Sequence, residues 1–233
     1  MHMEMFKEAL KSFIKGTPLE PLAKSCATQV QYYSLPKEVR MNRMYDGQTS
    51  QIMSRILSPT STCVDVGCNR GSILREIIRF APDVAHLAFE PIPELAEQLR
   101  KTFASSKARI YELALSDSIG EATFQHVLNS PGHSGLRKRS YPMPDAKIQE
   151  ITVRTERLDN IIPLETRIDF IKIDVEGAEF QVLSGAIETV KRYKPFIVFE
   201  HGIGGADYYG TTPEMMFKSC LSGCLPRLLP VVF

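Results

Sequence analysis

Short apolar runs alternate with amphipathic helical stretches from residue 63 onward, and this alternation restricts the fold more than any other feature of the chain. In order, the segments are CVDV, ILREIIRF, HLAF, PELAEQLRKTF, ARIYELAL, FIKIDV, EFQVLSGAIETVKRY and FIVFE. Strands and helices that alternate in this way are typical of a parallel sheet with helices on both faces. We therefore predict an α/β fold with a doubly wound, mainly parallel sheet, whose core consists of the periodic apolar positions.

The chain of 233 residues is long enough for one well-buried core and short for two full domains. Residues 1–60 are helix-rich in pattern, so we expect an N-terminal helical cap there and a single domain over residues 61–233. Two strand-like pieces, ATFQHVL and ITVRTERL, flank a stretch rich in Pro, Gly, Ser and charge. This stretch predicts an insertion loop at about residues 126–150, and loops of this length are usually functional or disordered.

The segment VDVGCNRG at residues 64–71 follows an apolar strand and opens an amphipathic helix. In this context Gly67 can take the tight turn off the strand, and Gly71 can let the backbone approach a ligand closely. A dinucleotide site would need the spacing G-x-G-x-x-G, but Asn69 occupies the position of the second glycine. The loop therefore predicts a ligand site that disfavours pyrophosphate.

Two acidic residues at the first two strands indicate what the loop binds. Asp65 precedes the first glycine, where its carboxylate can accept bonds from loop amides or face the ammonium of an amino-acid-like ligand. Glu90 follows Gly71 by 19 residues, where a doubly wound fold places the carboxylate that holds both ribose hydroxyls. The alternative is that Asp65 caps the helix and Glu90 is a solvated strand end. The presence of both acidic residues at this spacing favours S-adenosylmethionine (SAM), a nucleoside cofactor without phosphate.

Candidate catalytic residues follow the later strands, because ligands of open α/β sheets bind at the carboxyl ends of strands. Asp174 either holds the amino group of the cofactor's methionine or acts near the acceptor. Glu176 either orients a sugar hydroxyl or caps the next helix, whose first turn favours acids. His201 follows Glu200 at the end of the fifth strand and is a candidate base, against the alternative of a structural histidine.

Two further possibilities concern the loop and a metal ion. His133 and Ser134 lie in the long loop that could close over the site, although solvent exposure is the preferred interpretation for His133. The carboxylates after the last two strands, with His201, could hold a divalent cation, but no spacing among them is diagnostic. We therefore predict no metal site.

Composition argues against nucleic acid and membrane partners. The formal charge is +1, and the longest basic cluster is Arg137, Lys138 and Arg139, so a small-molecule or glycan acceptor is expected and nucleic acid is not. The five cysteines are scattered without disulfide-type or zinc-type pairing, which indicates a reducing compartment. No apolar run reaches the roughly 20 residues of a membrane span, so we expect a cytoplasmic protein.

Several blocks occur together from about residue 45 to residue 210. They are VDVGCNRG, AFEP, LALSDSIGEATF, SGL, VRTERLDNII, DFIKIDVEGAEFQVLSGA and PFIVFEHG. In this order they resemble the FkbM-type methyltransferases. The resemblance implies a Rossmann-like class I SAM methyltransferase fold and O-methylation of hydroxyls on sugars, polyketides and other natural products. It also implies a SAM site lined by Asp65, Gly67, Asn69, Gly71 and Glu90.

The resemblance has two further consequences. In such folds the residues after the third strand flank the adenine, which here implies Leu115, Ser116 and Asp117, although Asp117 can equally be a turn residue. The carboxyl end departs from the family, whose members continue through a helix into a final antiparallel hairpin, whereas this chain ends SGCLPRLLPVVF. We expect this hairpin to be truncated or altered, which would leave the strand FIVFE with an unpaired edge.

The leading interpretation is therefore a SAM-dependent O-methyltransferase. A SAM-binding or scaffolding protein without turnover stays open as an alternative because of the abnormal carboxyl end. An NAD(P)-linked oxidoreductase or epimerase is less favoured, since the glycine spacing and Asp65 argue against a diphosphate. Nucleic-acid methylation ranks below other acceptors, because the chain has neither a basic stripe nor an N-P-P-Y type motif.

Overall fold

The computed structural model describes residues 15–18, 20–22, 33–35, 37–163, 165–201, 204–216 and 231–232. The chain divides into two compact units, residues 1–48 and residues 49–233, and the sheets and the cleft belong to the second. The helices are Lys37–Ile56 (α3), Ser72–Phe80 (α4), Pro93–Thr102 (α5), Leu158–Ile161 (α6), Glu179–Ser184 (α7) and Ile187–Tyr193 (α8), and the 3-10 turns are Pro131–His133 (η1) and Ala206–Tyr209 (η2). The strands are Cys63–Val66 (β1), Leu87–Phe89 (β2), Arg109–Tyr111 (β3), Ala114–Leu115 (β4), Gly120–Val127 (β5), Ile148–Glu156 (β6), Phe170–Ile173 (β7), Phe196–His201 (β8) and Val231–Val232 (β9).

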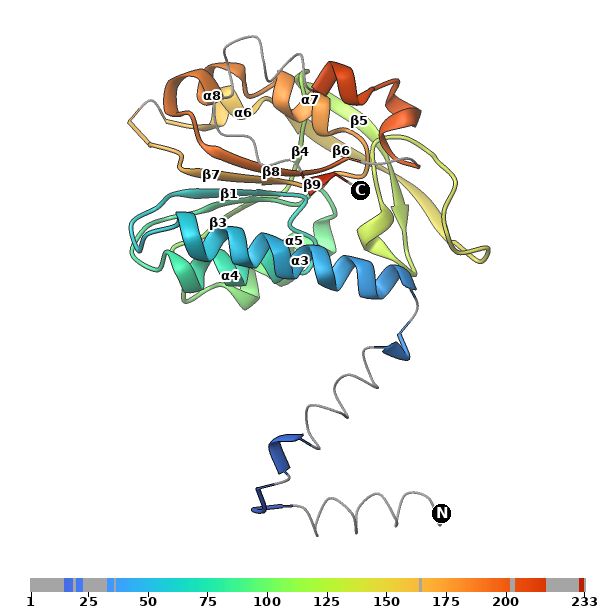
Figure 1. Cartoon of the computed structure of the whole chain (residues 1–233). Coiled ribbons are helices and arrows are strands. Elements are labelled where there is room, and N and C mark those ends of the chain that lie inside the picture. Colours follow the sequence, from blue (N-terminus) through green and yellow to red (C-terminus); the bar gives the residue numbers. More distant parts are fainter. Residues whose placement is uncertain are drawn as a thin grey trace. The chain divides into compact units, whose positions relative to one another are not determined.

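The main sheet has the order β3-β2-β1-β7-β8-β9, and all its neighbouring strands run parallel. Every residue of β1 and β2 is buried, as expected for strands of a parallel sheet covered on both faces. Figure 1 shows α4 and α5 on one face of this sheet and α6, α7 and α8 on the other. The predicted doubly wound, mainly parallel α/β fold is confirmed.

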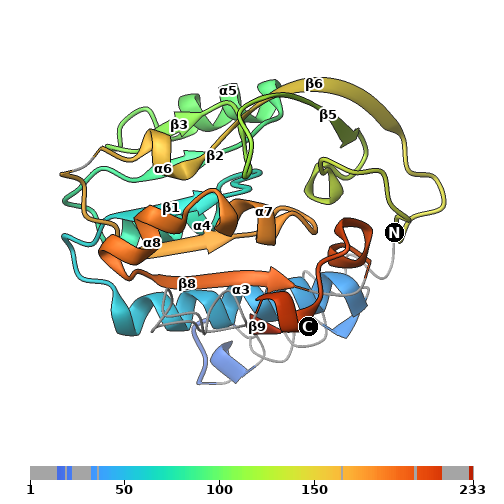
Figure 2. The ribbon, with the colours of Figure 1, turned by 90° about the horizontal axis from the view of Figure 1, so that it is seen from above.

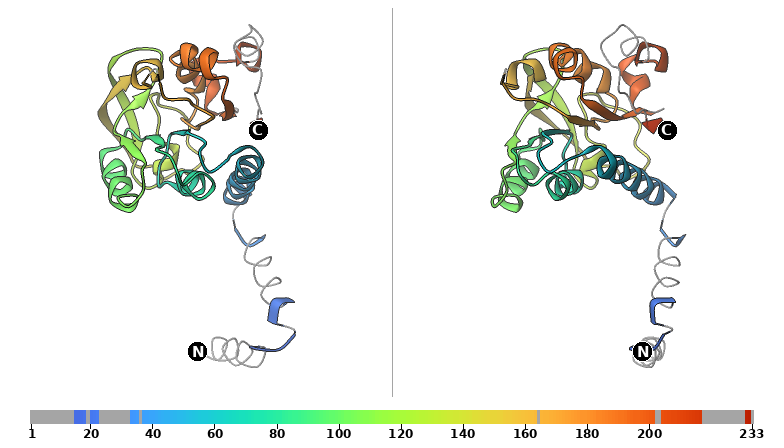
Figure 3. Two further views of the ribbon diagram at one scale, coloured as in Figure 1. Left: turned by 90° about the vertical axis from the view of Figure 1, so that its left-hand side faces the viewer. Right: turned by 60° about the vertical axis from the view of Figure 1, so that its left-hand side comes forward.

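Alternate residues of each strand supply the two halves of the core, because successive side chains point to opposite faces. Val64 and Ile171 belong to the cluster that includes Val182 and Val190 of α7 and α8. Cys63 and Phe170 belong to the cluster on the other face, which includes Ile77 of α4. The two helix layers on either side of the sheet are also visible in Figure 3.

A second, smaller sheet of order β4-β6-β5 carries the insertion. Strands β5 and β6 form an antiparallel ladder from the pair Gly120 and Thr155 to the pair Val127 and Ile148. The stretch between them, residues 128–147, is called the connecting segment below. It is narrower than the expected loop at 126–150, because the ladder extends into both ends of that range. Figure 2 shows it on the side of the main sheet toward which β7 and β8 point.

The chain ends bear on two expectations. The expected N-terminal cap over residues 1–60 falls partly on residues outside those described, and the expected change in the C-terminal hairpin at residues 220–233 lies outside them except for Val231 and Val232. The described pair Val231–Val232 runs parallel to Glu200 and His201 at the edge of β8. Among the described residues, no helix combines the length and the apolar character needed to cross a membrane.

Candidate functional site

A cleft lies at the carboxyl ends of β1, β2 and β7. Its walls come from the loops after these strands, from the region of β4 and from the connecting segment: Val66, Gly67, Asn69, Phe89, Glu90, Pro91, Ile92, Leu113, Ala114, Leu115, Phe124, Pro131, Gly132, Ser134, Leu136, Asp174, Val175, Glu176 and Ala178. Predicted cofactor residues therefore meet here with the candidate catalytic Glu176. The position agrees with the general rule for ligands of open α/β sheets.

Gly67 allows the loop after β1 to pack closely against the loop after β7. Its φ of 76° is in the left-handed region, and a Cβ on it would lie 1.8 Å from the carbonyl oxygen of Asp174. The Asp174 amide in turn donates to the Val66 carbonyl at 3.0 Å. The glycine is thus required for backbone packing between two strands, which positions Asp174 beside the loop.

Gly71 packs at the start of α4 against side chains of the next helix and the residue after it. It precedes α4 with a φ of 77°, and a Cβ on it would lie 2.5 Å from Cε2 of Phe103 and 2.8 Å from Cδ2 of Leu99. It is not among the described residues that line the cleft. Its small size therefore serves the packing of α4 against Leu99 of α5 and the following Phe103.

Asn69 and Glu90 form the wall between the first two strands. Asn69 has a φ of 48°, which asparagine tolerates better than most residues. Its amide donates to Glu90 Oε2 at 2.7 Å, and the Ile92 amide donates to Glu90 Oε1 at 2.9 Å. Glu90 is 4% exposed, and this burial raises its pKa to about 7, against the effect of the two amides. The carboxyl group thus holds the glycine loop and faces the cleft as well.

Lys172 holds two of the predicted acidic residues and was missed by the sequence analysis. Its Nζ lies 3.1 Å from Asp174 Oδ2 and 3.9 Å from Asp65 Oδ1, and its side chain is 12% exposed. Burial lowers the pKa of Lys172, but the charges of Asp174 and Asp65 outweigh that effect and raise it. Asp65 is 1% exposed, lies beside Lys172 and is not among the described residues that line the cleft.

The loop after Asp174 is shaped by Glu179, which the sequence analysis also missed. Glu179 Oε1 accepts from the Val175 amide at 3.2 Å and from the Gly177 amide at 3.0 Å. These bonds support a loop in which Glu176 has a φ of 59° and Gly177 one of 111°. Burial raises the pKa of Glu179 to about 7 and that of Glu176 well above its usual range. An acid in the first turn of a helix is the signal that could have found Glu179.

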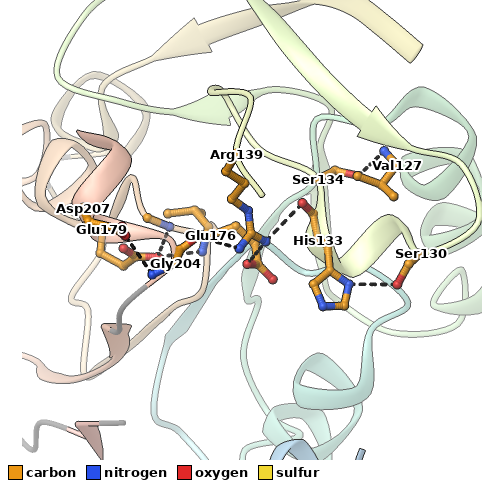
Figure 4. A network of polar contacts seen from close by, with 11 residues as sticks. Val127, Ser130, His133, Ser134, Arg139, Glu176, Glu179, Gly204 and Asp207 are labelled. Atoms are coloured by element: carbon orange, nitrogen blue, oxygen red, sulfur yellow. Dashed lines mark hydrogen bonds and ion pairs between the residues drawn. The ribbon is translucent and has the colours of Figure 1, made fainter. Parts of the chain in front are cut away.

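Arg139 of the connecting segment reaches Glu176, as Figure 4 shows. Its guanidinium pairs with the Glu176 carboxylate and donates to the carbonyls of Gly204 at 3.1 Å and His133 at 3.2 Å. The Arg139 side chain is 8% exposed and that of Glu176 is 24% exposed. The sequence showed Arg139 only as part of a basic cluster in a loop, and a partner 37 residues away leaves no local signal.

Of the three residues expected around adenine, only Leu115 lines the cleft. The Ser116 amide donates to the Glu156 carbonyl at 2.9 Å, and the Ser116 carbonyl lies 2.0 Å from where a Cβ on Gly185 would be. Asp117 is exposed and accepts from Ser116 Oγ at 3.2 Å, which agrees with the alternative of a turn residue. The apolar neighbours Leu113 and Ala114 take their places on the wall.

The end of β8 carries the remaining catalytic candidate, His201, and Glu200 before it. Phe199 of β8 pairs with Ile173 of β7. The next residues of the two parallel strands, Glu200 and Asp174, are therefore neighbours. Partial desolvation of its carboxyl group and the charge of Asp174 raise the pKa of Glu200 to about 8. His201 is the last residue of β8, and its side chain lies outside what the structure describes.

The two loop candidates support the connecting segment from within. Ser134 lines the cleft, and its hydroxyl accepts from the Val127 amide at 2.9 Å. His133 Nδ1 lies 2.8 Å from the Ser130 hydroxyl, and the side chain is half-buried rather than fully exposed (Figure 4). Within the described part of the chain, no group of three or more His, Cys, Asp or Glu residues is arranged to hold a metal ion.

Glu179→Gln is expected to raise the free energy of unfolding relative to wild type, and to raise it more at pH 8 than at pH 5. The amide oxygen of glutamine can still accept from the loop amides. The native carboxyl keeps its proton up to a pKa of about 7, while the unfolded one loses it near 4.5, so wild-type stability falls as pH rises between these values. The variant lacks this loss, which is on the order of 2 kcal/mol. Urea unfolding at both pH values measures it.

Glu188→Gln is the matched control, because Glu188 also lies in the first turn of a helix but its side chain is 69% exposed. Its effect on the free energy of unfolding should stay within about 0.5 kcal/mol at both pH values. If Glu179→Gln changed the stability equally at pH 5 and pH 8, the native carboxyl would not carry the raised pKa.

The chain is similar in sequence to known methyltransferases. Residues 65–215 match the family model described as the methyltransferase FkbM domain. The chain is 31% identical over 165 residues to the 2-O-methyltransferase NoeI of Sinorhizobium fredii, covering 65% of this chain and 67% of NoeI. It is 31% identical over 156 residues to the methyltransferase sdnD of Sordaria araneosa, covering 54% of this chain and 60% of sdnD.

One solved structure with a similar arrangement is a putative rRNA methylase from Clostridium thermocellum. The TM-score is 0.45 at 10% sequence identity, over 76% of this chain and 78% of that one. The family match covers the glycine loop, the Glu90 wall and the Asp174 to Glu179 loop, so it includes the cleft as well as the sheet. The chain belongs to the FkbM family of methyltransferases, whose cofactor is S-adenosylmethionine.

Proposed function

We propose that this methyltransferase transfers the methyl group of SAM to a hydroxyl oxygen of a sugar, a glycan or another hydroxyl-rich small molecule. The observation that carries the proposal is the joint presence of Glu90, Asp174 and Glu176 on one cleft wall beside the glycine loop. The name of NoeI, a 2-O-methyltransferase, supports oxygen as the receiving atom. The net charge of +1 supports a small acceptor over nucleic acid.

The residues of the cleft fit the cofactor. Asn69 Oδ1 is buried and makes no hydrogen bond within the described residues, so it is available to a ligand donor. Each Glu90 oxygen accepts one backbone amide and keeps a further lone pair, which suits ribose hydroxyls. Leu113 and Leu115 offer an apolar surface to the adenine. We place SAM against these residues, with Gly67 and Asp174 at its methionine end.

Asp174 and Glu176 are the proposed residues for the acceptor. Bound SAM supplies a methyl group on a positively charged sulfonium, and the acceptor hydroxyl must give up one proton in return. Lys172 keeps the Asp174 side chain oriented, and Arg139 does the same for Glu176. Burial and the neighbouring charge of Asp174 raise the pKa of Glu176, which makes its carboxylate the more basic of the two candidates beside the acceptor. His201 remains a proposed third candidate from its place at the end of β8.

Cofactor binding is tested first, by calorimetric titration with SAM, S-adenosylhomocysteine (SAH) and NADH. Replacing Glu90 with alanine is expected to weaken SAM binding at least ~10-fold, about 1.4 kcal/mol, because a charged hydrogen-bond acceptor is lost. Glu112→Ala is the control, since Glu112 follows the next strand but its side chain is 40% exposed and faces Arg100. Unchanged SAM binding in Glu90→Ala would contradict the assigned cofactor wall, and tight NADH binding would contradict the cofactor.

The acceptor class is tested separately with isotope-labelled SAM and a panel of methyl hexopyranosides, a phenol and a primary amine, with products analysed by mass spectrometry. Formation of an O-methyl glycoside that Glu176→Gln slows, without a change in SAH affinity, supports the proposal. Transfer only to the amine would exclude hydroxyl specificity. SAM binding without transfer to any member of the panel would exclude simple glycosides as acceptors.

A further inference from the structure

Besides the backbone bridge between Gly135 and Gln125 of β5, two groups of side-chain contacts join the connecting segment to the rest of the domain. One group lies at η2: Arg137 donates to the Tyr208 carbonyl at 2.9 Å, and the Tyr208 hydroxyl bonds Ser140. The other group consists of the contacts of Arg139, which runs to Glu176 and to the Gly204 carbonyl. Of these two arginines, Arg139 alone contacts a residue of the cleft wall.

Glu176 depends on contacts from outside its own loop. A left-handed conformation at a residue other than glycine is costly and persists only where the surroundings impose it. Glu179 imposes it on the backbone through the Val175 and Gly177 amides. The side chain is fixed by Arg139, whose Nε is itself buried without a hydrogen bond among the described residues. The carboxylate of Glu176 is therefore held at the cleft by a residue of the connecting segment.

The connecting segment also roofs the cleft. Pro131, Gly132, Ser134 and Leu136 belong to it and line the same wall space as Glu90 and Glu176. Its place over the cleft makes the segment the element whose displacement would admit or release a ligand. Such a displacement would separate Arg139 from Glu176, because the backbone that carries Arg139 would move with the segment.

We propose that Arg139 is a positioning residue that fixes the Glu176 carboxylate for the acceptor only when the connecting segment covers the cleft. The Arg139 to Glu176 ion pair thus couples closure of the segment to completion of the acceptor site. Without Arg139, no ion pair fixes the orientation of the half-buried Glu176 carboxylate. The acceptor site is therefore incomplete when the connecting segment does not cover the cleft. The proposal deepens the proposed function, since it rests on Glu176 as an acceptor residue.

Hydrogen exchange of the SAH-saturated protein tests the coupling without any acceptor. Arg139→Gln is expected to speed exchange both in residues 128–147 and at the Val175 and Gly177 amides. Glu176→Gln should give the same pattern, and the double variant should add little to either single change. Arg137→Gln is the matched control, because it removes only the contact with η2. It should leave exchange at the Val175 and Gly177 amides unchanged. Unchanged exchange at Val175 and Gly177 in Arg139→Gln would overturn the coupling.

Kinetics separate positioning from simple anchoring of the segment. With the glycoside panel, Arg139→Gln should lower kcat roughly tenfold, while the SAH dissociation constant stays within about twofold of wild type. Arg139→Lys should restore part of kcat, because lysine retains the charge but cannot reach all three partners at once. Equal loss in Arg137→Gln and Arg139→Gln would reduce Arg139 to an anchor and overturn the proposal. If wild type methylates no glycoside, the acceptor assignment fails, and the exchange experiment still decides the coupling.

Discussion

A Gly67→Ala variant is expected to lose at least about 3 kcal/mol of unfolding free energy, together with SAM binding. The added Cβ would lie 1.8 Å from the Asp174 carbonyl oxygen, so the loops after β1 and β7 have to separate. The φ of 76° adds the cost of a left-handed conformation for alanine. Because the hydrogen bond from Asp174 to Val66 links the same loops, their separation displaces the wall of the cleft. Chemical denaturation and SAH titration measure both losses.

Two further glycines serve as controls that separate conformation from contact. Gly210 has a φ of 67° but no atom within 4 Å of an added Cβ, so Gly210→Ala should show the conformational cost alone, about 1 kcal/mol. Gly47 lies within α3, has no such neighbour and no positive φ, so Gly47→Ala should be neutral or stabilising by up to about 1 kcal/mol. If Gly67→Ala cost no more than Gly210→Ala, the contact with Asp174 would not matter.

The alternation of strands and helices was enough to predict the sheet, because burial on both faces requires apolar strands and amphipathic helices that are visible locally. The spacing from Gly71 to Glu90 likewise follows from the length of one helix and one strand. These are properties of neighbouring residues in sequence. The family resemblance is confirmed by the match over residues 65–215. It could be seen in the sequence because its blocks are segments of consecutive residues.

The structure adds contacts between distant segments that the sequence does not show. Gly71 packs against the ring of Phe103, which follows the next helix. Asp117, for which a turn was the equal alternative to a place near adenine, follows the end of β4 and is exposed. Arg139 meets Glu176 only because the connecting segment folds back over the cleft. No periodicity or spacing encodes such contacts, so the cleft residues that follow the strands were more predictable than the contacts of the connecting segment.

Lys172 shows how a sequence signal can be present and still incomplete. A lysine inside the apolar strand FIKI is unusual, because charged residues are rarely buried unless paired. That observation predicts a partner but cannot say which one. The register of β1 against β7 places Asp65 directly beside Lys172, and this register is a property of the sheet rather than of either strand. Asp174 completes the group two residues farther along β7.

Removing this lysine should therefore be among the most damaging single changes in the core. Lys172→Met keeps much of the volume but leaves Asp65, which is 1% exposed, without its cation. Breaking a buried ion pair by removing one partner costs about 3–5 kcal/mol, and we expect a loss of that size in urea unfolding at pH 8.

The double variant Lys172→Met, Asp65→Asn identifies the cause of the loss. If the loss comes from an uncompensated carboxylate, the second change should recover more than about 1 kcal/mol, which is a coupling typical of residues in one ion-pair network. Lys191→Met is the control, because Lys191 also pairs with a glutamate, at 3.4 Å from Glu188, but its side chain is 50% exposed and its removal should cost less than about 0.5 kcal/mol. A Lys172→Met variant as stable as Lys191→Met would show that Asp65 is stabilised by other groups. It would also remove the electrostatic argument for Lys172 as the residue that orients Asp174 at the cleft.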